Sequence, residues 1–142
     1  MTEHDFANLP AVTFHRIKFL FLFVFSLVTS AAVAQTEVPV GSDLRAGLFD
    51  LARSGVEEMA GRSVKFAGSL QQLGGYAFFK GRIVDKSGKT IFVGDHESGD
   101  TVILWKKAGG RWEVVTYDVG ITDVSWARWP ELYGAPEELL FP

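Results

Sequence analysis

The sequence contains no cysteine. This absence excludes a disulfide framework, thiolate ligands for a metal ion and a cysteine nucleophile. Dense clusters of Lys and Arg are also lacking, and the formal net charge is −3. Because binding to DNA or RNA needs a concentrated basic surface, the sequence argues against nucleic acid as the main partner. With 22% charged and 13% aromatic residues, the composition is that of a folded chain rather than a disordered one.

The N-terminal region has the pattern of an export signal. Arg16 and Lys18 precede an apolar run over residues 19–28, and Ala32-Val33-Ala34 provides small residues for a cleavage site. We therefore predict a signal peptide over residues 1–34 and a periplasmic or secreted protein that has left the membrane after cleavage. Two alternatives are a transmembrane anchor, for which the apolar segment is short, and a buried core helix.

Beyond residue 34 the sequence predicts a single α+β domain. Residues 35–42 form an extended leader, residues 43–121 contain the helix and the sheet, and residues 122–142 form a C-terminal tail packed on the domain. A helix and a sheet each have an apolar face, so packing them as two layers buries both faces. Without cysteine, this packing alone must stabilise the domain.

The first predicted element is a long amphipathic helix over residues 43–60. Ser42 is a favourable N-cap, and Gly61 can take the left-handed conformation that ends a helix. The residues expected on the inward face recur at helical spacing. They are Leu44, Leu48, Leu51, Gly55 and Met59, joined by Phe49, Ala52 and Val56.

After Gly61 the apolar residues alternate with a period of two, which indicates strands. We expect a curved antiparallel sheet of four or five strands, in which residues 91–93 are the candidate for the additional strand. The other four are expected at residues 63–70, 76–84, 101–107 and 111–117. Trp105 and Trp112 lie on either side of the last hairpin turn, close enough for a cross-strand aromatic pair.

One stretch of the last hairpin resembles a known family. The run Gly110-Arg111-Trp112-Glu113-Val114-Val115 is similar to the final hairpin of cystatin-like and NTF2-like α+β domains, where a G-x-W-x-V stretch is common. The order of one helix before the strands resembles the cystatin-like arrangement more than the NTF2-like one, which has three N-terminal helices. The resemblance implies a sheet wrapped on the helix, and it implies no particular activity.

The predicted tail is rich in aromatic residues. Trp126 and Trp129 are three residues apart, so a helical turn would place both rings on one face, with Tyr133 following them. If exposed, the three residues form a surface that binds a ligand or a partner protein. If buried, they cover the open face of the sheet, which is the alternative we favour.

Residues suited to catalysis are sparse. His96 is the one histidine after residue 34, and the acidic loop around it, Asp95 to Asp100, matches no known spacing of metal ligands. We therefore predict no metal site and no cofactor. Asp118 and Asp123 flank the end of the last predicted strand, where a buried carboxylate would serve an NTF2-like enzyme as a general base. We favour the alternative that both are turn or N-cap residues.

These patterns together predict an exported, non-catalytic binding or accessory module. Its partner would be a protein or a small apolar ligand held between helix and sheet. The competing hypothesis is an NTF2-like enzyme that uses Asp118 or Asp123 as the base in an apolar pocket. A third class, a secreted inhibitor of a hydrolase, agrees with the size and the resemblance, although no residue argues for it.

Overall fold

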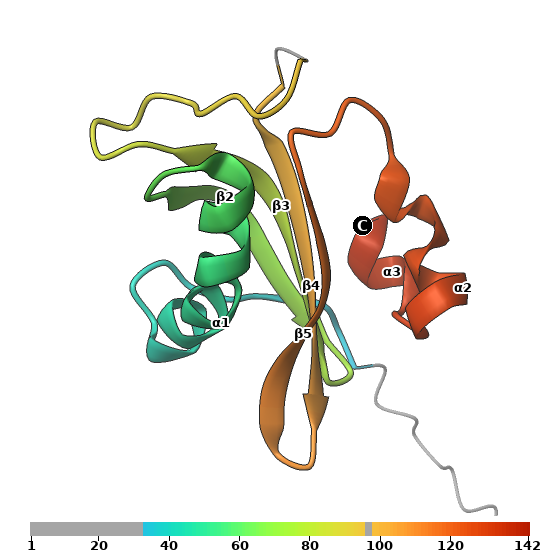
Figure 1. Ribbon diagram of the computed structural model, residues 1–142. Helices are drawn as coiled ribbons and strands as arrows, with labels where there is room; N and C mark the ends of the chain where they lie inside the picture. Colours follow the sequence, from blue (N-terminus) through green and yellow to red (C-terminus); the bar gives the residue numbers. More distant parts are fainter. Residues whose placement is uncertain (1–32, 96–97) are drawn as a thin grey trace, which may run out of the picture. The chain divides into compact units, whose positions relative to one another are not determined.

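The computed structural model describes residues 33–95 and 98–142 (Figure 1). The predicted signal peptide therefore lies outside the described residues, except for Val33 and Ala34. Within the part of the chain that is described, no helix has the length and apolar character needed to cross a membrane.

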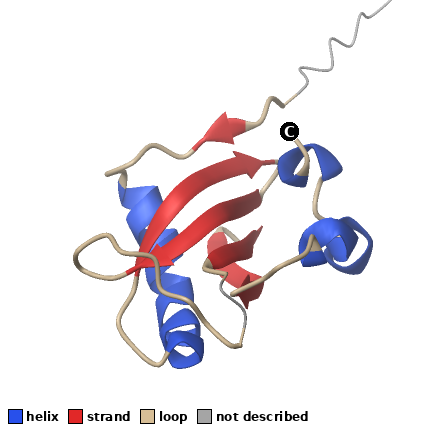
Figure 2. Cartoon of the chain, turned by 90° about the horizontal axis from the view of Figure 1, so that it is seen from above, coloured by secondary structure: helices blue, strands red, loops and turns tan. Residues whose placement is uncertain are grey.

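Five antiparallel strands form one sheet in the order β1-β2-β3-β4-β5. Helix α1 covers one face of the sheet, and the C-terminal segment with η1, α2 and α3 covers the other (Figures 1 and 2). The predicted α+β class is thus confirmed. The elements are β1 (Thr36–Glu37), α1 (Asp43–Ala60), β2 (Lys65–Leu73), β3 (Tyr76–Val84), β4 (Asp100–Ala108), β5 (Arg111–Val119), η1 (Ser125–Arg128), α2 (Trp129–Tyr133) and α3 (Glu137–Leu140).

Helix α1 begins and ends where its sequence predicts. The Ser42 side chain accepts a hydrogen bond from the backbone N–H of Arg45, at 3.3 Å, and Gly61 ends the helix with φ of 67°. The predicted inward face is only partly right, because Leu51 and Met59 are exposed. The buried side chains of α1 lie instead on a narrower stripe that includes Leu48, Phe49, Ala52 and Val56.

Two apolar cores lie on opposite faces of the sheet, because successive residues of a strand point to opposite sides. On β3, Ala77, Phe79 and Ile83 face α1, whereas Phe78 faces the tail. We call the two layers the helix-side core and the tail-side core. The helix-side core also contains Leu48, Phe49, Ala52, Val56, Leu70, Ile103 and Trp105, and the tail-side core contains Phe78, Val102, Leu104, Trp126, Trp129, Ala135, Leu139 and Leu140.

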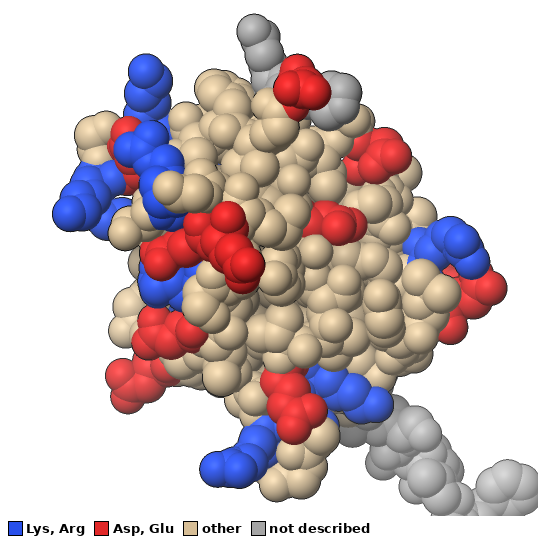
Figure 3. Space-filling view, in the orientation of Figure 1, with Lys and Arg blue, Asp and Glu red and all other residues tan. Residues whose placement is uncertain are grey.

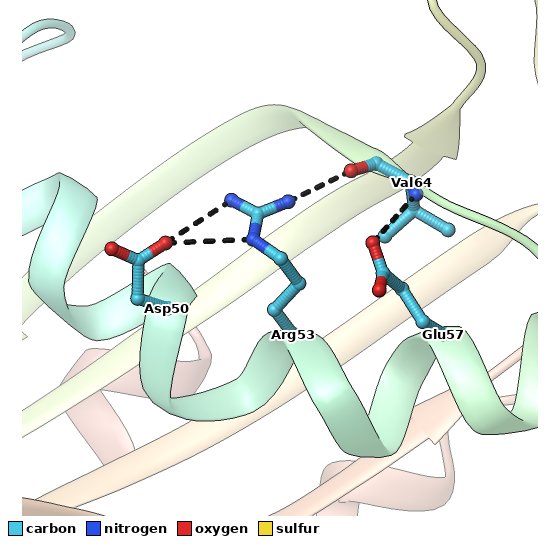
Figure 4. Close-up of polar contacts among 4 residues, drawn as sticks. All are labelled: Asp50, Arg53, Glu57 and Val64. Atoms are coloured by element: carbon cyan, nitrogen blue, oxygen red, sulfur yellow. Dashed lines mark hydrogen bonds and ion pairs between the residues drawn. The ribbon is translucent and has the colours of Figure 1, made fainter.

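Polar side chains of α1 fix the helix to the start of β2 (Figure 4). Arg53 donates from Nη1 to the carbonyl oxygen of Val64 at 2.8 Å, and the N–H of Val64 donates to Glu57 Oε1 at 3.1 Å. Asp50 pairs with Arg53 at 3.4 Å. Both backbone groups of Val64 therefore have partners where the ladder of β2 has not yet begun.

Arg45 is a buried charge that connects three segments of the domain. Its guanidinium donates to the carbonyl oxygens of Val38, at 3.0 Å, and Gly68, at 2.7 Å, and lies 5.2 Å from the centre of the Phe49 ring. A buried guanidinium is tolerated when its N–H groups find acceptors. These contacts hold the segment before α1 and the middle of β2 against the helix.

Two glycines allow β2 and β3 to approach closely. Gly68 pairs with Gly81 in the register of the two strands. A Cβ atom on Gly81 would collide with the carbonyl oxygen of Ala67 and stand 2.7 Å from the Phe79 ring. The absence of a side chain at this position therefore lets Phe79 fold over the strand into the helix-side core.

The strand predictions are confirmed for 76–84, and the other strands differ at their ends. Residues 91–93 form no strand, which corrects the expectation for this segment. Only a single bridge joins Thr90 to Val84, because the neighbour of β3 in the sheet is β4. The turn between Val84 and Thr90 is stabilised by Asp85, whose carboxylate accepts hydrogen bonds from Ser87 and from the backbone N–H of Lys89.

The last hairpin combines a two-residue turn at Gly109-Gly110 with a β-bulge further along β5. Leu104 pairs with Thr116 but Trp105 pairs with Val114, so Val115 is an extra residue on β5. The register between the turn and the bulge, which begins with the pair Ala108 and Arg111, places Trp105 opposite Val114 rather than Trp112. The two tryptophans are therefore diagonal neighbours and not a directly opposed pair. β5 is the last strand of the sheet, and its outer edge has no neighbouring strand among the described residues.

Charged side chains are unevenly distributed over the face of the molecule that β5 turns towards the viewer in Figure 1. Basic and acidic side chains stand mainly towards the margins in this view, and the middle is largely uncharged (Figure 3). Val114, Val115, Thr116 and Tyr117 of β5 are all half-buried. The stretch of β5 between Glu113 and Asp118 therefore carries no charged side chain.

Candidate functional site

A groove lies on the tail side of the sheet, where β3 ends and β4 begins. Its volume is about 540 Å³. We call it the tail-side groove. Its lining comes from the end of β3, the start of β4 and the first part of the tail, namely Lys80, Gly81, Arg82, Asp100, Thr101, Val102, Ile121, Thr122, Asp123, Val124 and Trp126.

The strand register brings the charged residues of the groove together. Lys80 and Arg82 are two residues apart on β3 and therefore project from the same face. Lys80 is paired with Val102 of β4, and Arg82 is paired with Asp100. A pair of cationic side chains consequently stands next to an acidic one and an apolar one on the floor of the groove.

The tail forms the opposite wall because β5 is followed by a sharp return. The backbone N–H groups of Gly120 and Ile121 both donate to the carbonyl oxygen of Asp100, at 2.9 and 3.1 Å. Gly120 has φ of 71°, which a glycine adopts without strain. This return places residues 121–124 beside the start of β4.

The charges around the groove are not neutralised by ion pairs with one another. Lys80 lies over the indole ring of Trp126, with Nζ 4.7 Å from the ring centre. Across residues 33–95 and 98–142, the salt bridges are Asp50 with Arg53 and Arg128 with Glu131. Lys80, Arg82, Asp100 and Asp123 are thus available to charged groups of a ligand.

The two candidate carboxylates have different surroundings. Asp118 is half-buried and accepts a hydrogen bond from Ser125 Oγ at 2.7 Å, and it does not line the groove. Asp123 lines the groove and is exposed. The expected N-cap role of Asp123 is wrong, since Val124 precedes η1 and no side chain caps this short helix.

The three aromatic residues of the tail are buried to different extents. Trp126 is 6% exposed and Trp129 is 4% exposed, whereas Tyr133 is 37% exposed. Trp129 packs edge-to-face on Phe78, with the ring centres 6.1 Å apart. The two tryptophans therefore belong to the tail-side core, and Trp126 also forms part of the wall of the groove.

The indole N–H of Trp126 is buried and has no hydrogen-bond partner among residues 33–95 and 98–142. Most buried donors in proteins are paired, and an unpaired one costs about 1–3 kcal/mol. The position of Trp126 next to the groove thus combines an aromatic surface with an unsatisfied polar group.

A second, smaller cavity adjoins the same part of β3. Its volume is about 170 Å³, and Lys80 lines it as well as the tail-side groove. Phe78, Leu139, Leu140 and Pro142 provide most of its apolar lining. Lys80 therefore stands between two hollows on the tail side.

The structure does not bring metal ligands together in its described part. No group of three His, Asp or Glu side chains within residues 33–95 and 98–142 is placed to hold a metal ion. His96 and Glu97 of the acidic loop lie outside the described residues. No comparison supplies a further guide, since no family model, no curated protein and no solved structure matches the chain.

The sequence did not reveal the groove, although Lys80 lies on the same face of β3 as Phe78. The signal was the alternation in β3, where two cations follow an aromatic residue on one face. The missing information was the register between β3 and β4, which adds Asp100, and the return of the tail, which adds Asp123. The space between α1 and the sheet, where a ligand was expected, is occupied by the helix-side core.

Proposed function

We propose that this protein is an exported, non-catalytic binding module whose small ligand occupies the tail-side groove. The observation that carries the proposal is the groove itself, in which an apolar wall with Val102 and Trp126 meets charged groups that form no salt bridge with other described residues. Cavities of this size, with a few convergent polar groups, are typical of small-molecule sites. A protein partner that inserts a single side chain into the groove is an alternative within the same class.

Export and the finer fold assignment belong to the same proposal. The sequence over residues 1–34 supports export, as argued above. A single helix α1, followed by four of the five strands of one antiparallel sheet, supports a cystatin-like arrangement. The covering of the second face of the sheet by the tail is an addition to that arrangement.

A variant that fills the groove tests the proposed function. Val124 is exposed and lines the groove, so Val124→Trp should occupy the space that the ligand needs. Val40 is also exposed and does not line the groove, so Val40→Trp is the matched control. Native mass spectrometry of the full-length proteins, purified from the producing cells, should show a bound small molecule in the control and none in Val124→Trp.

Two results would contradict the proposal. If the same mass is retained by both variants, the ligand lies elsewhere on the protein. If no small molecule and no co-purifying protein is found with the control, the tail-side groove is not a binding site.

An NTF2-like enzyme is the second candidate function, because Asp123 lines the groove. A general base must reach the substrate, and Asp123 is the predicted carboxylate whose position satisfies this condition. Under this alternative, the molecule captured by Asp123→Asn would differ chemically from the one released by the unmodified protein. Identical captured molecules argue for the binding module.

A further inference from the structure

The charged residues of the tail-side groove limit which ligands it can hold. Two cations, Lys80 and Arg82, are matched by two carboxylates, Asp100 and Asp123, so the lining has no net charge. None of the four forms a salt bridge within the described part of the chain. The groove is therefore dipolar rather than basic or acidic.

This arrangement disfavours ligands that have charge of a single sign. An anion attracted to Lys80 and Arg82 would also meet the repulsion of two carboxylates, and a cation would meet the converse repulsion. A neutral apolar ligand would remove water from charged side chains without providing them with partners, which is costly. A molecule with one ammonium and one carboxylate group provides partners for charges of both signs.

The uncharged part of the lining defines the remainder of the ligand. Val102, Ile121 and Val124 form an apolar surface next to the aromatic ring of Trp126. A volume of about 540 Å³ accommodates a small molecule with a side chain that covers this surface. Burial of an apolar side chain there would add to the attraction between the charged groups.

We infer that the tail-side groove binds a small zwitterion with an apolar side chain, either a free amino acid or a short peptide with both ends free. The carboxylate of the ligand pairs with Lys80 and Arg82, its ammonium group pairs with Asp123, and its side chain packs on Trp126. This inference rests on the proposed function and specifies the chemistry of the same site.

Isothermal titration of the full-length protein with four probes tests the inference. Phenylalanine has both charges, N-acetylphenylalanine only the negative one and phenylalanine amide only the positive one. Glycylphenylalanine has both charges at a greater separation. We expect phenylalanine or the dipeptide to bind at least about tenfold more tightly than either singly charged probe, since each lost charged contact weakens binding by about this factor. Whichever zwitterion binds more tightly identifies the source.

Matched variants assign the binding to the groove. Lys80 and Lys106 are both exposed, and each lies over an aromatic ring, that of Trp126 or Tyr76. Lys80→Met should weaken binding of the zwitterion about tenfold, whereas Lys106→Met should leave it unchanged. Asp123→Asn should weaken binding of the zwitterion but not of N-acetylphenylalanine.

Four results would count against the inference. Equal binding of all four probes would show that the groove does not select for both charges. Equal effects of Lys80→Met and Lys106→Met would place the ligand elsewhere. If none of the probes binds while the Val40→Trp protein still retains a small molecule that Val124→Trp lacks, the proposed function stands and the zwitterion is the wrong ligand. Absence of both kinds of binding overturns the proposed function as well.

Discussion

Trp129 is the residue whose loss should weaken the tail most. It is almost completely buried and packs on Phe78 and Tyr133. Truncating a buried aromatic side chain typically costs about 3–5 kcal/mol, so Trp129→Ala should lower the free energy of unfolding by about this amount. Phe141 is half exposed, and Phe141→Ala should cost well under about 1 kcal/mol. Chemical denaturation of the two variants beside the unmodified protein measures the difference, and equal midpoints would show that the tail is not part of the stable fold.

Trp126 offers a separate test of its unpaired N–H group. Trp126→Phe removes this group together with part of the ring, so the gain from losing an unsatisfied donor offsets part of the lost packing. We expect Trp126→Phe to cost at most about 1.5 kcal/mol, whereas Trp126→Ala should cost about 3–5 kcal/mol. Thermal unfolding of both variants provides the comparison. A loss in Trp126→Phe as large as in Trp126→Ala would mean that the N–H group has a partner.

The pKa of the Asp85 carboxyl group is shifted by its hydrogen bonds in the folded protein. The hydrogen bond from the Ser87 side chain, and next that from the backbone of Lys89, hold the pKa of the Asp85 carboxyl below its ordinary value of 3.8. A lowered pKa in the folded state means that the contribution of this carboxylate is present above pH 3.8 and is lost as the pH falls through the lowered value. NMR titration should show this lowered pKa, and Ser87→Ala should raise it. An unchanged pKa in Ser87→Ala would assign the shift to another cause.

At the scale of single residues, the sequence could not show that Arg45 is buried. Its position in α1 agrees with a helical face, but a charged residue is ordinarily assigned to solvent. Its acceptors are two backbone carbonyl groups, on Val38 and Gly68, that lie in other segments. No pattern along the helix contains that information, because it depends on how the leader and β2 pass over α1.

The two glycines inside α1 should respond oppositely to the same substitution. A Cβ atom on Gly47 meets nothing within 4 Å, so Gly47→Ala should stabilise the helix by up to about 1 kcal/mol. A Cβ atom on Gly55 would collide with the hydroxyl of Tyr117 and stand 2.7 Å from its ring, so Gly55→Ala should lower stability although alanine favours the helix. Urea denaturation separates the two, and a gain at both positions would show that β5 does not pack on α1 at Gly55.

At the scale of elements, local sequence patterns predicted α1 and β3 correctly. They did not predict which segments pair as neighbouring strands, or where the pairing is irregular. The capping residues Ser42 and Gly61 fix α1 locally, and alternation fixes β3. Residues 91–93 have the apolar composition of a strand, but β3 is already paired with β4. The bulge at Val115 likewise depends on the pairing of β4 with β5, and the alternation of apolar residues along β5 alone does not reveal it.

At the scale of the whole molecule, the predicted cleavage site determines where the mature chain begins. Cleavage after Ala34 would leave Gln35 as the first residue, directly before β1. Intact-mass measurement of the protein recovered outside the cytoplasm should therefore give the mass of residues 35–142, or that mass with a cyclised N-terminal glutamine. Recovery of the uncleaved chain from the membrane fraction would favour the anchor over the signal peptide.

The tail-side groove exists only at this scale. Its residues come from three segments that are separated along the chain, and each segment alone has an ordinary composition. The sequence predicted that the tail contacts the sheet, because so many large apolar side chains need cover. It could not predict that the cover is incomplete, since this depends on the return of the chain at Gly120.

The bulge on β5 also affects how copies of the protein behave when concentrated. A long, regular outer strand acts as a template on which further chains add and aggregate. Here Val115 interrupts the regular spacing of the backbone donors and acceptors on β5, so an incoming strand cannot pair along its full length. The uncharged stretch between Glu113 and Asp118 would otherwise favour such growth. A single surplus residue thus limits pairing between the exposed edges of two copies.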